Sequence, residues 1–452
     1  MRRPGTAAHL RGERPRMAFG AAASDHCPHG GEDPSARAAA DDAPSGSASR
    51  PRASRRWYFR VGRLATGLAL AALAAAPFAG ARGRDIVVRA GGEAALGQPV
   101  VVFELRHPNG RPLEAGPDEI LGGLLDGVPL AAILDTGASG TVLSGPTAQR
   151  YAVAAERGAR YVEVGMTGEH AMGVSRPYGL VLCDEGAAAR RGRRGCPSVL
   201  ELRAQRFLLN APAGDAMALL ASPGATTDVV GMPAIREAVV EIRSATAGAA
   251  PLAVEIHPRG ARVPADVWVP LDLVDFNRRA HPANRGPLPS LTVNPMIPGV
   301  RVTAGARHAE GDWLLDTGSA VTILSSPLAR ALGLVDAAGR PARPPAFALP
   351  VGGISGAERS LPGFRLDRLE LAAADGRTIV VEDPAVLVHD VVTTTDDGVE
   401  HRLDGILGMN VLASSGSGMT LAGFARTYPP AFARVVIDVP GRRLGLTPRR
   451  GR

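Results

Sequence analysis

Two aspartates, Asp135 and Asp316, stand in the same local sequence and could act together as a pair of carboxylates. Each begins an Asp-Thr-Gly triplet, and residues 133–144 match residues 314–325 over most of their length. One such tripeptide arises by chance at roughly one position in several thousand, so a single triplet would be a modest signal. Two triplets in matching apolar frames, 181 residues apart, indicate an internal repeat.

The chemistry available to such a pair depends on a shared proton. Two carboxylates in one cleft cannot both ionise cheaply, so they hold one proton between them. The ionised partner can activate a water as general base, while the protonated partner hydrogen-bonds the developing oxyanion. Because the pair titrates as a unit, neither Asp135 nor Asp316 receives a fixed role. This chemistry uses no metal and no cofactor, and we expect neither.

A second shared element lies downstream of each triplet. Residues 228–233 and 404–410 both contain apolar residues followed by a glycine, Gly231 in the first copy and Gly408 in the second. Glycine has no Cβ, so it permits close approach of another backbone. The loop that carries each Asp-Thr-Gly triplet is here called the Asp loop. We expect each of these glycines to let a strand pack tightly behind the Asp loop of its copy.

The combination of apolar-apolar-Asp-Thr-Gly-Ala/Ser with a later apolar-apolar-Gly resembles the aspartic proteases, both pepsin-like and retroviral. The resemblance covers roughly residues 115–265 and 295–448, and the spacing within each copy looks more like a retropepsin-like domain. It implies an all-β bilobal fold, with two pseudo-symmetric β-barrel-like lobes, a central cleft and a few short helices. It also implies an aspartic endopeptidase that hydrolyses peptide bonds with a dyad-activated water. A single chain would suffice as a monomer, with residues 82–265 as the first lobe and residues 266–452 as the second.

The residues that follow each aspartate have expected supporting roles in this loop. Thr136 and Thr317 offer short hydroxyls that can hydrogen-bond backbone across the interface between the copies. Gly137 and Gly318 let the chain turn sharply and bring its N–H groups close to the carboxylates. A plain tight turn is the alternative explanation for these glycines.

The next position differs between the copies, with Ala138 in the first and Ser319 in the second. The family resemblance implies that a hydroxyl at this position hydrogen-bonds the dyad. Since Ala138 has no hydroxyl, we expect one carboxylate to hold its proton to higher pH. The working range would then extend from mildly acidic toward neutral pH.

Each copy also contains a Gly-rich segment between β-like runs, which could form a flap that covers the substrate. Ordinary hairpin turns are the alternative. The candidate flap residues are Gly165, Met166, Thr167 and Gly168 in the first copy and Gly352, Gly353, Ile354, Ser355 and Gly356 in the second.

The first 81 residues have the layout of a leader. Residues 1–53 are rich in Ala, Gly, Ser, Pro and Arg without an apolar period, which is typical of disorder. Basic residues then precede an apolar run at residues 64–78, and small residues at 79–81 resemble a cleavage site. The pattern indicates export to a periplasmic or extracellular location, by a general or a twin-arginine signal. A retained membrane anchor is the alternative.

Cysteine usage agrees with export. Cys27 lies in the leader, and only Cys183 and Cys196 remain beyond it. In an oxidising compartment these two could form a disulfide, and two free buried thiols are the alternative. No histidine cluster accompanies them, so they do not suggest a metal site.

The net charge of +7 does not indicate a polyanion partner. The first 81 residues hold 12 arginines and 6 acidic residues, leaving 39 arginines against 38 acidic residues in the remainder. A basic face for nucleic acid therefore has no support. We expect a peptide or protein substrate as the partner, and a membrane only if the leader is retained.

Two other functions remain compatible with the repeat. The fold could serve as a non-catalytic peptide-binding or regulatory module, but both Asp-Thr-Gly triplets are intact. The same carboxylates could also serve a glycoside hydrolase. Sugar stacking usually needs more aromatic side chains than the 3 Trp and 5 Tyr of this chain.

Overall fold

The computed structural model describes residues 84–449, apart from 91, 96, 117–129, 166–167, 185–195, 211–226, 246–251, 277–280, 353–357, 395–399, 414–417, 420–424 and 427–429. All described residues belong to the unit Ala76–Arg452, and the expected leader lies outside them. Within the described part of the chain, no helix has the length and apolar character needed to cross a bilayer.

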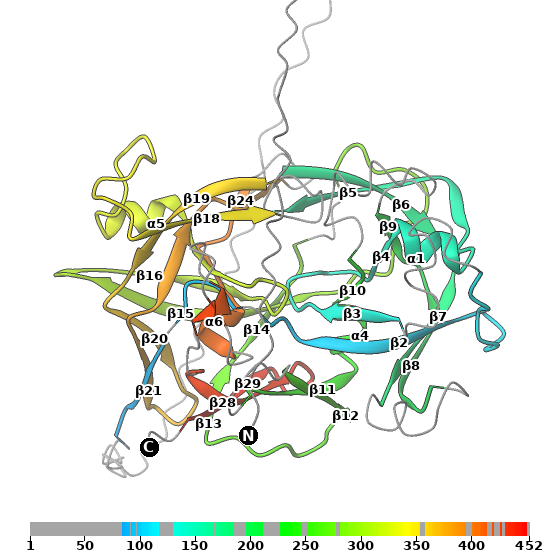
Figure 1. Cartoon of the computed structure of the whole chain (residues 1–452), viewed down its shortest axis with the longest axis horizontal. Coiled ribbons are helices and arrows are strands. Elements are labelled where there is room, and N and C mark those ends of the chain that lie inside the picture. The colour runs from blue at the N-terminus through cyan, green and yellow to red at the C-terminus, as the bar shows by residue number, and fades with distance from the viewer. Residues whose placement is uncertain are drawn as a thin grey trace, which may run out of the picture. The chain divides into compact units, whose positions relative to one another are not determined.

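Most of the first copy forms one nine-stranded sheet (Figure 1). In spatial order its strands are β5 (Ala155–Gly165), β6 (Gly168–Ser175), β9 (Leu208–Asn210), β4 (Val142–Ser144), β10 (Val229–Val230), β3 (Ala131–Leu134), β2 (Val100–Arg106), β7 (Tyr178–Cys183) and β8 (Ser198–Gln205).

Most of the second copy forms an eleven-stranded sheet. Its strands follow the order β1 (Ile86–Arg89), β21 (Thr378–Glu382), β20 (Arg368–Ala372), β15 (Asn294–Ala304), β16 (Arg307–Leu315), β25 (Gly405–Leu407), β17 (Thr322–Leu324), β22 (Ala385–Val388), β19 (Glu358–Arg365) and β18 (Phe347–Gly352), with β14 (Asp272–Val274) also paired to β15.

A third sheet, here called the shared sheet, draws strands from both copies and lies along the lower side of Figure 1. Its order is β12 (Ala253–Pro258), β11 (Ala238–Arg243), β28 (Phe432–Asp438), β29 (Arg443–Pro448) and β13 (Val267–Pro270). The remaining described elements are β23 (Val392–Thr394), β24 (Glu400–Arg402), β26 (Gly418–Met419), β27 (Ala425–Arg426) and the short helices α1 (Gly145–Arg150), α4 (Met232–Ile235), α5 (Ser326–Ala331) and α6 (Met409–Leu412). The expected all-β bilobal fold is confirmed.

The repeated unit is visible in the strand pairing. In the first copy β10 inserts between β3 and β4, parallel to one and antiparallel to the other. In the second copy β25 inserts in the same way between β16 and β17. In each copy a short helix follows β4 or β17. It has Ser144 or Ser325 as its N-cap and a proline in its first turn. Proline is favoured there because its missing N–H would have no helical partner.

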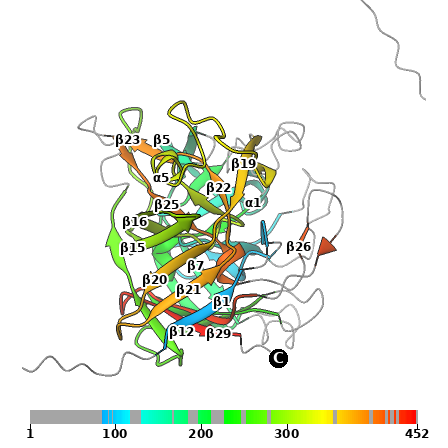
Figure 2. The same cartoon turned by 90° about the vertical axis from the view of Figure 1, so that its left-hand side faces the viewer.

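One strand crosses between the copies. Strand β1 pairs in parallel with β21, so that Ile86 lies opposite Ile379, and Figure 2 shows the two strands side by side. Sheet membership therefore does not follow sequence order, although the division near residue 265 stays a prediction. At the outer edge of the nine-stranded sheet, Cys183 and Cys196 form a disulfide next to the β7–β8 pairing.

Candidate active site

The two Asp loops meet where their strands end. Asp135 directly follows β3 and its N–H donates to Val230 O at 3.0 Å, while Asp316 follows β16 and donates to Leu407 O at 3.1 Å. The inserted strands β10 and β25 thus fix the backbone of both aspartates. The approach between the loops is close, because a Cβ at Gly137 would lie 2.6 Å from Asp316 Cγ.

The same restriction applies in the opposite direction. A Cβ at Gly318 would collide with the carboxylate of Asp135. Only glycine allows the two loops to pack at this distance. The structure therefore brings Asp135 and Asp316 together. The carboxylate of each lies against the glycine of the other loop.

The carboxylates of the pair lie close enough for each to shift the pKa of the other. Burial raises the pKa of Asp135, and burial together with the charge of Asp135 raises the pKa of Asp316 well above its ordinary value. Backbone N–H groups offset part of this, since Gly137 donates to Asp135 Oδ1 at 2.7 Å and Gly318 donates to Asp316 Oδ1 at 2.9 Å. Such a pair retains one proton between its two members.

Thr136 and Thr317 connect the two loops. Thr136 Oγ1 donates to Leu315 O at 2.6 Å and accepts from the N–H of Thr317 at 3.0 Å. Thr317 Oγ1 donates to Leu134 O at 2.6 Å and accepts from the N–H of Thr136 at 3.1 Å. Both threonines are fully buried, so these bonds fix one loop against the other.

The downstream glycines lie directly behind the Asp loops. A Cβ at Gly231 would overlap the carbonyl oxygen of Gly140, and one at Gly408 would overlap the carbonyl oxygen of Val321. In both copies the strand that ends in this glycine packs against backbone with no space for a side chain.

The expectation that the hydroxyl after the Asp-Thr-Gly triplet hydrogen-bonds the dyad is wrong. Ser319 Oγ donates to Val321 O at 2.7 Å, and it is the backbone N–H of Ser319 that donates to Asp316 Oδ1, at 3.0 Å. Ala138 supplies the equivalent N–H to Asp135 Oδ1 at 3.1 Å. The two copies therefore give their aspartates the same donors, and the absent hydroxyl of Ala138 does not distinguish them.

Two amide side chains that the sequence analysis missed support the loops from the opposite copy. Asn294, at the start of β15, donates its Nδ2 to Thr136 O and Gly137 O, both at 3.0 Å. Gln98, just before β2, donates its Nε2 to Gly318 O. Each amide lies at or just before the start of the strand that pairs with an Asp-bearing strand, and it reaches the other Asp loop.

The dyad lies in a cavity of about 520 Å³, here called the cleft, which residues of both copies line. Both Gly-rich segments connect the strands of hairpins near the upper side of Figure 1, with Gly165 paired to Gly168 and Gly352 paired to Glu358. Gly352 lines the cleft. The other flap candidates, Met166, Thr167, Gly353, Ile354, Ser355 and Gly356, lie outside the described residues. Their role as a flap stays a prediction.

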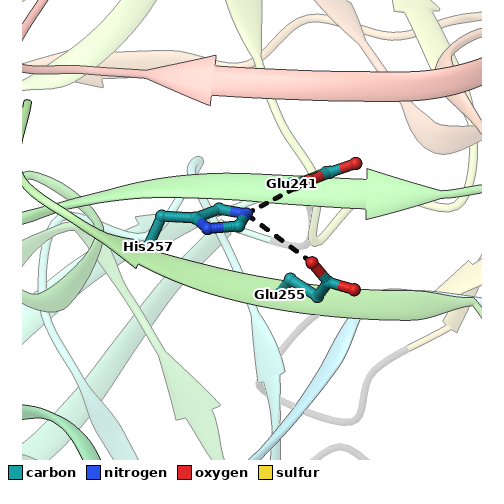
Figure 3. Close-up of side chains that lie close together, drawn as sticks. All are labelled: Glu241, Glu255 and His257. Atoms are coloured by element: carbon teal, nitrogen blue, oxygen red, sulfur yellow. Dashed lines mark hydrogen bonds and ion pairs between the residues drawn. The ribbon is translucent and has the colours of Figure 1, made fainter. Parts of the chain in front are cut away.

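A second titratable cluster occurs on the shared sheet (Figure 3), and none of its residues lines the cleft. His257 Nε2 lies 3.1 Å from Glu241 Oε2 and 3.8 Å from Glu255 Oε2. Glu241 Oε1 also pairs with Arg243 at 2.7 Å and with Arg434 at 2.9 Å. A divalent cation would be repelled by two guanidinium groups at this distance. The cluster is therefore an ion-pair network that connects β12, β11 and β28.

In the comparison with known protein families, the match falls on the second copy. Residues 300–411, which include Asp316 and Gly408, match the aspartyl protease family. No curated protein matches the chain. Among solved structures, the crystal structure of basic 7S globulin from soybean is similar at 10% sequence identity and a TM-score of 0.38, covering 77% of this chain and 96% of that one. Residues 300–411 therefore carry the sequence features of an aspartyl protease domain.

Proposed function

We propose that this chain is an aspartic endopeptidase in which Asp135 and Asp316 form the catalytic dyad. The observation that carries the proposal is the close approach of two half-buried carboxylates, contributed by equivalent loops, in a cleft that residues of both copies line. Hydrogen bonds from backbone N–H groups hold both carboxylates in place before a substrate binds. Such preorganisation is what general acid–base catalysis requires.

In the proposed reaction the ionised aspartate removes a proton from a water held between the carboxylates. The resulting hydroxide adds to the carbonyl carbon of the peptide bond while the protonated aspartate gives its proton to the carbonyl oxygen. The C–N bond of the tetrahedral intermediate then breaks as the dyad transfers a proton to the leaving nitrogen. One hydroxyl of the intermediate returns its proton to the dyad, which leaves a carboxylic acid and an amine as products. One proton remains on the dyad at the end, so the cycle can repeat.

The hairpins β5–β6 and β18–β19 are the proposed flaps over the substrate. Closure over a peptide would exclude water and strengthen the electrostatic interactions of the dyad. Since one chain supplies both aspartates, we propose that the active form is a monomer.

The proposal is tested by digesting a peptide library at several pH values, with and without the inhibitor pepstatin. We expect cleavage, its loss with pepstatin, and its loss in Asp135→Asn. Peptide binding without any cleavage would instead identify a non-catalytic binding module.

We also propose that the protein is exported. The Cys183–Cys196 disulfide supports this, because structural disulfides persist in oxidising compartments. Sequencing of the mature N-terminus after cell fractionation would test it. We expect an exported chain that begins after Ala81, whereas an uncut chain in the membrane fraction would identify a retained anchor.

A further inference from the structure

A third carboxylate, that of Glu163, lines the cleft together with the dyad. Glu163 lies on β5, directly across the hairpin from His170 on β6. Among the described residues that line the cleft, Asp135, Asp316 and Glu163 are the titratable ones, and none is basic. The cleft therefore contains three acidic groups and no described cation to balance them.

Glu163 has no partner of its own in the described part of the chain. No hydrogen bond or ion pair reaches its carboxylate there, and its neighbour His170 directs Nε2 to Asn210 Oδ1 at 2.6 Å. Burial and the charge of Asp135 raise the pKa of Glu163 to about 7. A carboxylate in this environment would be stabilised by a cation supplied from outside the protein.

The opposite hairpin has a different character. In the second copy, β18 contributes Leu349, Pro350 and Val351 to the cleft, all without charge. The cleft wall from the first copy thus contains one carboxylate besides the dyad, that of Glu163, whereas the wall from β18 carries no charge among the described residues. A substrate that complements both walls carries a basic residue on one side of the scissile bond and apolar residues on the other.

We propose that Glu163 is a specificity-determining residue that binds a lysine or arginine side chain of the substrate close to the scissile bond. This inference rests on the proposed peptidase function and names the class of peptide that the cleft accepts. The ion pair would form in a site partly withdrawn from water, where charge-assisted hydrogen bonds are strongest.

The test compares peptides that contain lysine with otherwise identical peptides that contain acetyl-lysine, at each position flanking one cleavage site. Acetylation removes the charge and retains most of the shape. We expect wild type to favour lysine at one position by about 10- to 100-fold in kcat/KM, the range for a hydrogen bond to a charged group. Glu163→Gln should reduce that preference to near unity while still cleaving the acetyl-lysine peptide, which also shows that the variant folds.

Glu169→Gln is the matched control, because Glu169 lies on the same hairpin but is 62% exposed and pairs with His281. It should retain the wild-type preference. Equal cleavage of both peptides by wild type, or an unchanged preference in Glu163→Gln, would overturn the inference and leave the peptidase proposal intact.

A binding measurement separates the two proposals if no peptide is cleaved. Lysine and acetyl-lysine peptides with a reduced, uncleavable bond are titrated into wild type and Glu163→Gln by calorimetry. Tighter binding of the lysine peptide to wild type alone would support the role of Glu163 without catalysis. If wild type and Glu163→Gln show the same preference between the two peptides, that role is refuted.

Discussion

Thr136 and Thr317 are linked by reciprocal hydrogen bonds, in which each hydroxyl accepts the backbone N–H of the other residue. Each hydroxyl also donates to the carbonyl of the residue just before the opposite aspartate, Leu315 or Leu134. The position of one Asp loop therefore depends on the other copy, and the dyad is a property of the interface.

Replacing Thr136 with Val should destabilise the protein by about 2–4 kcal/mol, because two buried backbone groups lose their partners. Urea denaturation measures the change. Thr136→Ser is the control, since it keeps the hydroxyl and should lose only about 1 kcal/mol. Equal losses in the two variants would mean that the hydroxyl does not hold the copies together.

Asp135→Asn and Asp316→Asn should each lower kcat/KM by about 10²- to 10⁴-fold, the usual contribution of general acid–base catalysis. Because the carboxylates act as a unit, the double variant should be no worse than either single variant. Steady-state kinetics on one peptide, with circular dichroism as a folding control, provides the measurement. Full activity in either single variant would exclude a shared dyad.

Ala138→Ser should leave the pH dependence of kcat/KM unchanged. The equivalent Ser319 gives its hydroxyl to Val321 O, so a serine at position 138 is expected to bond backbone in the same way. The pH–rate profiles of wild type and variant on one peptide test this. A shift toward acid of about half a unit or more would show that the new hydroxyl reaches Asp135.

Asp228 should make the protein less stable as pH rises. Its carboxylate accepts from Ser144 N at 2.7 Å and Thr147 Oγ1 at 2.6 Å, yet burial raises its pKa from 3.8 to about 6. The folded state thus binds this proton more tightly than the unfolded state. This stabilisation is complete below about pH 4 and is lost as pH rises through 6, an effect of roughly 3 kcal/mol.

Asp228→Asn removes that titration while the other buried carboxylates remain in place. The free energy of unfolding of the variant should therefore decline less steeply between pH 4 and pH 6 than that of wild type. Urea unfolding at pH 4, 5 and 6 gives the two slopes. Parallel slopes would show that Asp228 titrates in the folded state as it does in the unfolded chain.

Removing the disulfide with Cys183→Ser and Cys196→Ser together should lower stability by about 2–3 kcal/mol, as expected for a short closed loop. Peptide cleavage should persist, because the bridge joins the end of β7 to the segment just before the edge strand β8 and does not line the cleft. Reductant should destabilise wild type and leave the variant unaffected. A loss of cleavage in the variant would connect this edge of the sheet to the dyad.

The repeat in the sequence predicted the parts of the site that both copies build alike. Asp135 and Asp316 could be paired because their loops occupy the same place in equivalent units, and Gly231 and Gly408 because both contact backbone. The supporting amides could not be found in this way. Gln98 lies 37 residues before Asp135 and Asn294 lies 22 residues before Asp316, so no common spacing marks them.

Contacts that the repeat does not contain were also beyond sequence reasoning. The pairing of Ile86 with Ile379 joins segments with no shared motif, and alternation of apolar residues cannot reveal a partner strand. The orientation of the Ser319 hydroxyl depends on the nearby carbonyl of Val321. Glu163 resembled any other polar strand residue until the hairpin placed it in the cleft.

The pairing of β1 with β21, together with the shared sheet, determines when this protein can become complete during synthesis. The first described strand has no partner until residues 378–382 exist, and β11, which pairs with β12 on one side, gains its other neighbour only with β28, which ends at Asp438. Contacts this distant in sequence form late and slowly. A chain emerging from the ribosome therefore has its first Asp loop long before it has the framework that aligns the pair. We therefore expect the alignment of the two aspartates only after the residues through Asp438 have been made.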